Sequence, residues 1–178
     1  MASDFPLTRV EKTTLGTKEE IKTMLDASKD HVFKGKKPRF IEKENILKYR
    51  GIHTKTGLEQ LIKENGGGKY ALRDLKINLT TGVYECRPEL VLKDGTTVIR
   101  DGNNGVCSFF PDNWSNKKIE AEVTHAAQNI IGRLEFKRNN FIGLSSDGKM
   151  RIVIQFDEYV NKEGKLIKKV TSFYPLYE

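Results

Sequence analysis

The stretch YALRDLKINL (residues 70–79), followed by TTG (80–82) and VYECRPELVL (83–92), decides the fold. Apolar and polar residues alternate through both ten-residue runs, which is the pattern of strands with one buried face. The TTG segment supplies a turn between them, and Asp94-Gly95 predicts a second hairpin that leads into a strand over 96–99. An antiparallel sheet is therefore expected in the middle of the chain.

Three helices are expected around this sheet. Two of them begin at a capping box, in which a threonine precedes a glutamate by three residues. The first is predicted from Thr17 to about residue 29, the second from Thr56 to the glycines at 66–68, and the third from Ser115 through Ile130. The basic stretch 32–39 is expected to form a loop, and 41–49 a short helix or turn.

Strands are expected again over 140–144, 150–157 and 166–174. The fold class is therefore α+β, with N-terminal helices packed on a mostly antiparallel sheet that one helix interrupts. We divide the chain into an N-terminal extension and helix (1–28) and a main domain (29–178).

The chain is basic, with 31 Lys and Arg against 24 Asp and Glu and a net charge of +7. Such an excess favours a polyanionic partner, with nucleic acid first, an acidic protein second and an anionic membrane a distant third. A basic protein with no such partner is the alternative. No apolar run approaches the length of a membrane span, and the N-terminus lacks the pattern of a signal peptide. Two cysteines, Cys86 and Cys107, are too few for a disulfide framework and lack zinc-site spacing.

Two of the three histidines lie in polar segments punctuated by glycine: His31 in DHVFKG (30–35) and His53 in GIH (51–53). Histidine is the side chain best suited to proton transfer near neutral pH, so this pair in a basic chain suggests acid–base cleavage of RNA. Two surface histidines without a catalytic role are the alternative. His125 falls within the periodic pattern of the third helix, where a structural or solvent-facing role is expected.

Four segments in order resemble the EndoU-type endoribonucleases: HVFKG (31–35), GIHT (51–54), GVCSFFPDNWS (105–115) and TSFYPL (171–176). They are similar to the bacterial EndoU toxin domains of polymorphic and contact-dependent inhibition systems. They resemble the coronavirus uridylate-specific endoribonuclease more distantly. The resemblance covers about Lys29 to Leu176, which is most of the chain.

The resemblance implies a nuclease fold of the barnase, EndoU, colicin and RelE type. It implies that His53 is the general base and His31 the general acid, and that Ser108, Ser172 and Tyr174 contact the substrate. RNA, with tRNA as one candidate, would be cut at uridylates to leave 2′,3′-cyclic phosphate and 5′-hydroxyl ends. It further implies a toxin that is secreted or delivered into a target cell, and an acidic immunity protein as partner.

In one respect the chain departs from the family pattern, because no lysine stands shortly before Ser108. Arg100 is the nearest upstream cation and is the predicted third catalytic residue, with Lys93 as the second candidate. We expect no cofactor; manganese stimulation, seen in part of the family, cannot be predicted because no acidic or histidine cluster has ligand spacing.

Seven cations lie between His31 and His53: Lys34, Lys36, Lys37, Arg39, Lys43, Lys48 and Arg50. They are interpreted either as a solvated loop or as a clamp for RNA or for an acidic inhibitor. The missing lysine leaves a non-catalytic RNA-binding module as the alternative function. A DNA-binding protein is not expected, since no helix-turn-helix, zinc or basic-zipper pattern is found.

Overall fold

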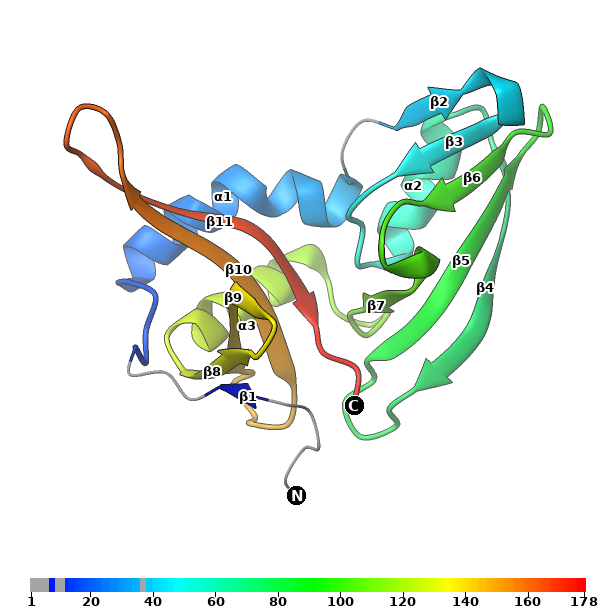
Figure 1. The fold of residues 1–178 in the computed structure, drawn as a ribbon. Helices are drawn as coiled ribbons and strands as arrows, with labels where there is room; N and C mark the ends of the chain where they lie inside the picture. The colour runs from blue at the N-terminus through cyan, green and yellow to red at the C-terminus, as the bar shows by residue number, and fades with distance from the viewer. Residues whose placement is uncertain (1–6, 9–11, 36–37) are drawn as a thin grey trace. The chain divides into compact units, whose positions relative to one another are not determined.

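The computed structural model describes residues 7–8, 12–35 and 38–178. By their internal contacts, the chain's residues form two compact units. The first comprises the residues up to Lys29 together with Trp114–Leu176 and Glu178, and the second comprises Asp30–Asn113 with Tyr177. Both contain helical and strand residues, so the chain is an α+β protein, as the sequence predicts (Figure 1). The division at residue 28 stays a prediction; it lies beside the point where the first helix passes from one unit to the other.

In chain order the described elements are β1 (Leu7–Thr8), α1 (Lys18–Lys34), β2 (Arg39–Ile41), a 3₁₀ turn (Glu42–Glu44), β3 (Ile46–Tyr49), α2 (Lys55–Glu64), β4 (Gly68–Ile77), β5 (Tyr84–Leu92), β6 (Thr97–Arg100), a 3₁₀ turn (Asn103–Gly105), β7 (Cys107–Phe109), α3 (Asn116–Ala127), β8 (Ile130–Leu134), β9 (Lys137–Leu144), β10 (Arg151–Val160) and β11 (Leu166–Pro175). Within the described ranges, none of the helices combines the length and the apolar character that a membrane span requires.

The sheet of the second unit has the strand order β2-β3-β6-β5-β4, with β7 paired to β5 (Figure 1). The two alternating runs pair antiparallel from Ile77 opposite Tyr84 to Gly68 opposite Leu92, which confirms the predicted hairpin. β3 and β6 run parallel, so their carboxyl ends lie at the same edge of the sheet. Alternate residues of β5 are buried, and they form one core with apolar side chains of α2.

The sheet of the first unit is antiparallel, with the order β1-β8-β9-β10-β11. The predicted strands at 140–144, 150–157 and 166–174 correspond to β9, β10 and β11, each somewhat longer than expected. Helix α3 lies directly against β9, because a Cβ at Gly143 would overlap the backbone of Ala126. Apart from β1, the strands before α3 and the strands after it belong to separate sheets.

Helix α1 begins as predicted but ends later. Thr17 and Glu20 form the capping box, with Thr17 N donating to Glu20 Oε1 at 3.0 Å and Glu20 N to Thr17 Oγ1 at 3.1 Å. The helix continues past residue 29 to Lys34, because Val32 and Phe33 bury their side chains and packing extends it over the expected loop. His31 consequently lies on a helix.

Two further local predictions are corrected. The second helix is capped by Thr54, whose side chain accepts from Gly57 N at 3.1 Å, and not by Thr56. The stretch 41–49 forms β3 after a short 3₁₀ turn, and not a helix, because Leu47 and Tyr49 alternate into the core while the strand pairs with β2 and β6. The earlier cap places His53 immediately before the N-cap residue of α2.

Candidate active site

The turn that presents His53 has an unusual backbone. Strand β3 ends at the buried Tyr49, and the chain then passes through Gly51 at φ 79° and Ile52 at φ 63°. A β-branched residue in the left-handed region is a genuine outlier and costs of order 1–3 kcal/mol, so the surrounding structure must hold it. Ile52 is fully buried, and such strain beside a titratable side chain is typical of functional sites.

His53 is buried and held on both sides of its backbone. His53 N donates to Val32 O at 3.0 Å, and Phe110 N donates to His53 O at 2.9 Å. The ring Nδ1 lies 2.8 Å from Ser108 O, and only 4% of the residue is exposed. Because a carbonyl oxygen can only accept, Nδ1 carries the proton and the lone pair of the neutral ring is on Nε2. This is the tautomer that a general base needs.

His31 lies on the last turns of α1, one residue before Val32, whose carbonyl accepts from His53 N. The structure therefore brings the two histidine segments together through the backbone, although the side chain of His31 lies outside what the structure describes.

Two glycines allow this approach. A Cβ at Gly35 would lie 2.5 Å from Arg50 O, and a Cβ at Gly57 would overlap Phe33 O and lie 2.9 Å from Ile52 Cγ2. Side chains at either position would therefore push the end of α1 away from the His53 turn.

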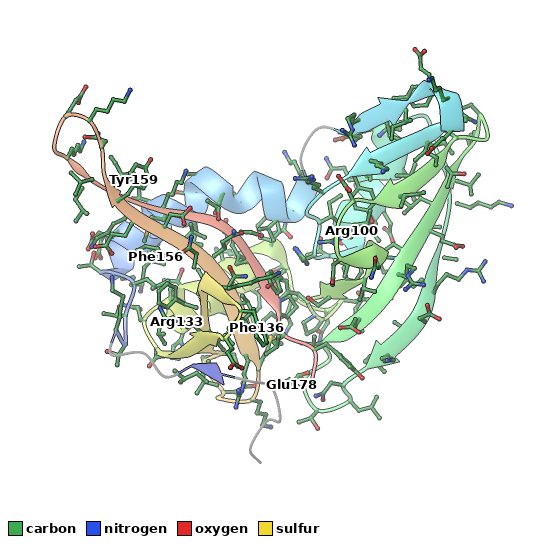
Figure 2. The ribbon with its side chains drawn as sticks, viewed as in Figure 1. Arg100, Arg133, Phe136, Phe156, Tyr159 and Glu178 are labelled. Atoms are coloured by element: carbon green, nitrogen blue, oxygen red, sulfur yellow. The ribbon has the colours of Figure 1, made fainter. Side chains whose placement is uncertain are left out.

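Arg100 ends β6 in the same unit, beside the 3₁₀ turn that precedes β7 (Figure 2). Its Nη1 donates to Val106 O at 3.3 Å, while its Nε and the Tyr49 hydroxyl are buried without a hydrogen-bond partner among the described residues. The pKa of Tyr49 is raised mainly by burial and to a smaller extent by the neighbouring Cys107, and the charge of Arg100 acts against that rise. Arg100 is thus a half-buried cation next to Cys107, the residue that touches the His53 ring.

Lys93, the second candidate for the missing cation, follows β5 at its far end. Cys86 near the start of β5 is opposite Cys107, so about 23 Å of extended strand separates Lys93 from that pair. This span exceeds the reach of a lysine side chain. Of the two cations, the geometry favours Arg100.

Ser108 lies on β7, and the structure gives its backbone a role that the sequence did not predict, since its carbonyl fixes the His53 ring. Cys107 was also missed: its Sγ lies 3.4 Å from His53 Nδ1. The alternation of residues in β7 could have pointed to Cys107. Cys107 and Phe109 are buried on one face of the strand, which places the side chain of Ser108 on the opposite face.

Ser172 and Tyr174 belong to β11 in the first unit. Ser172 is buried beside a register shift between Gln155 and Phe156 in β10, and the Tyr174 hydroxyl accepts from Asn140 Nδ2 at 3.2 Å. Their assignment to the substrate site rests on the family resemblance. His125 is in the same unit, where its Nδ1 lies 3.2 Å from Leu144 O and ties α3 to β9.

The basic stretch after α1 is only partly described. Arg39 and Lys48 are directly opposite on β2 and β3, so their side chains share one face. Arg50 pairs with Asp101 at 3.2 Å, and this hydrogen bond lowers the pKa of the half-buried carboxylate. Across the described residues, no three His, Cys, Asp or Glu side chains are grouped so that they could hold a metal ion.

Comparison with known proteins gives the family. Residues 25–177 match the family described as Bacterial EndoU nuclease. A protein of Bacillus cereus named "Toxin" is 32% identical over 117 residues, which are 66% of this chain and 18% of that protein. The chain thus matches less than a fifth of that relative's length. No solved structure matches the chain. The match over residues 25–177 covers all four segments that carried the resemblance, and the chain belongs to the bacterial EndoU nucleases.

Proposed function

We propose that this chain is an endoribonuclease that cleaves RNA by attack of the substrate's own 2′-hydroxyl, leaving 2′,3′-cyclic phosphate and 5′-hydroxyl ends. The observation that carries the proposal is the His53 ring, which is buried with Nδ1 against Ser108 O, so that the neutral ring has its lone pair on Nε2. The EndoU family membership and the net charge of +7 support a nuclease that acts on a polyanion.

His53 takes the proton from the 2′-hydroxyl, and His31 gives a proton to the departing 5′-oxygen. The hydrogen bond from His53 N to Val32 O supports this pairing, since it places the backbone of the two histidine segments side by side. Arg100 is the proposed cation for the developing phosphorane charge. This reaction needs no metal, because the two histidines supply both proton transfers.

On the resemblance to the family, we assign uridine recognition to Ser108, Ser172 and Tyr174. The same resemblance supports a barnase- or EndoU-like fold. The relative named "Toxin" supports a toxin that acts after delivery into a target cell. An acidic immunity protein would neutralise the basic chain in the producing cell, since opposite charge speeds association.

Incubation of the purified protein with total RNA and with short uridine-containing oligonucleotides tests the function. We expect cleavage with and without EDTA, and mass spectrometry should find a cyclic phosphate on one product and a hydroxyl on the other. An oligonucleotide with a single 2′-deoxyuridine at the cleavage position should remain intact, because it lacks the attacking group. Cleavage of that substrate, or a 5′-phosphate product, would exclude the mechanism. Tight binding without cleavage would instead indicate the non-catalytic RNA-binding module.

Arg100→Ala is expected to lower turnover by roughly 10²–10³-fold, the loss seen when one transition-state donor is removed. Lys93→Ala is the matched control, because it removes a cation from the opposite end of the same sheet. Single-turnover rates of both variants would decide the assignment. A wild-type rate for Arg100→Ala would transfer the role to another cation.

A further inference from the structure

The thiol of Cys107 occupies a central place behind the His53 ring. Its Sγ lies 3.3 Å from Ile52 O, 3.4 Å from Ser108 O and 3.4 Å from His53 Nδ1. The first contact is with the strained residue that turns the chain toward His53. The other two are with the hydrogen bond that sets the tautomer of the ring. One atom thus contacts both the strained turn and the hydrogen bond that orients the ring.

The thiol carries its proton at neutral pH. Burial raises the pKa of Cys107 to about 11, although the charge of Arg100 and a hydrogen bond from Arg100 act in the opposite direction. A protonated thiol is a weak donor as well as a weak acceptor. It can donate to the carbonyl of Ile52 while its sulfur faces the Nδ1–H group, so both contacts are satisfied together.

The contact with Ile52 O satisfies a carbonyl group in a strained turn. A buried carbonyl in an irregular turn has no strand or helix partner of its own, and it needs a donor. Cys107 supplies that donor from β7, an element that β5 fixes through the opposed pair Cys86 and Cys107. The orientation of the His53 ring is thereby coupled to the sheet and does not depend on the turn alone.

We propose that Cys107 is a positioning residue for His53: its thiol holds the Ile52 carbonyl and the Nδ1 edge of the ring, and so keeps Nε2 directed at the substrate. The proposal rests on the proposed function, in which His53 is the general base. It adds a residue that does not itself touch the substrate.

Cys86 provides a matched control within the same core. It is directly opposite Cys107, is equally buried, and burial likewise raises its pKa to about 12. Valine at either position adds a similar volume to one hydrophobic cluster. Only Cys107 is within hydrogen-bond distance of His53 and Ile52 among the described contacts of the two thiols.

The test compares Cys107→Val, Cys107→Ser and Cys86→Val. Valine puts two methyl groups in place of the thiol and removes the polar contacts, and Cys86→Val controls for the added volume, whereas serine keeps a donor and an acceptor. We expect Cys107→Val to cleave a uridine-containing oligonucleotide about tenfold more slowly at saturating substrate, with KM little changed, because the base is misdirected while binding surfaces remain. Cys107→Ser should stay closer to the wild-type rate, and Cys86→Val should match it. Equal rates for all three variants, or equal losses in Cys107→Val and Cys86→Val, would overturn the proposal.

Nitrogen-15 NMR of the His53 ring gives a readout that needs no catalysis. In the wild type the neutral ring should carry its proton on Nδ1. In Cys107→Val we expect a mixture of tautomers or a broadened signal, and in Cys86→Val the wild-type spectrum. An unchanged ring in folded Cys107→Val would refute the positioning role even if the protein cleaved no RNA. Absence of RNA cleavage by the wild type, with the ring changed as expected, would refute only the proposed function.

Discussion

The variant His53→Asn is expected to cleave RNA about 10²–10⁴-fold more slowly than the wild type while it keeps its fold. The asparagine Nδ2 can take the place of the histidine Nδ1 and donate to Ser108 O, so the buried hydrogen bond is retained. The lone pair of Nε2 has no equivalent in asparagine, so the proposed general base is removed. Single-turnover cleavage and thermal unfolding by circular dichroism measure the two effects separately.

His125→Asn is the control for this experiment. His125 also binds a backbone carbonyl through Nδ1, that of Leu144, but it belongs to the first unit and ties α3 to β9. Its rate should remain near that of the wild type. A His53→Asn protein that is folded and fully active would show that the base is another group, whereas one that is unfolded would have to be replaced by His53→Gln.

Gly57→Ala is expected to destabilise the protein by about 1–3 kcal/mol and to slow cleavage, because the new methyl group overpacks a closed contact. At an exposed helical position the same change stabilises by about 1 kcal/mol, since alanine has the higher helix propensity. Here the methyl group would overlap Phe33 O and press against Ile52 Cγ2. Because α1 approaches the start of α2 so closely, alanine at this position is expected to destabilise the protein, where at an exposed position it would stabilise it.

Gln60→Ala, at an exposed position of the same helix, should change the unfolding free energy by less than about 0.5 kcal/mol. Urea unfolding of both variants provides the comparison. A Gly57→Ala protein that is more stable than the wild type would contradict the described contact between the two helices.

The sequence predicted those elements whose own pattern decides their structure. The alternating runs at 70–79 and 83–92 formed their hairpin, and Thr17 and Ser115 capped their helices, because pleat and capping are local effects. It failed where distant contacts decide. Within the stretch 41–49, residues 46–49 became a strand because they pair with β6, which follows α2 and the β4–β5 hairpin in the chain. The extension of α1 to Lys34 likewise depends on burial that the helix cannot provide by itself.

For the site, the glycine-flanked segments indicated His53, and the helix start that follows it was predicted two residues too late. The partners of its ring could not be predicted in the same way. Ser108 contributes a backbone carbonyl, which no side-chain pattern reveals, and Cys107 acts through a strand register that is set by β5. The left-handed backbone of Ile52 is unpredictable too, because an isoleucine is a poor candidate for that conformation.

The parallel pair of β3 and β6 has a consequence for the order of folding. Ile46 and Thr97, which are opposite in that pair, are separated by about 50 residues of chain, so the entropy of closing a long loop must be offset before they meet. The β4–β5 hairpin joins neighbouring segments, so we expect it to close earlier. His53 follows one strand of the late pair and Arg100 ends the other. We therefore expect the segments that carry them to come together late in folding, so that a chain with its hairpins but without this pair would have secondary structure and no assembled candidate site.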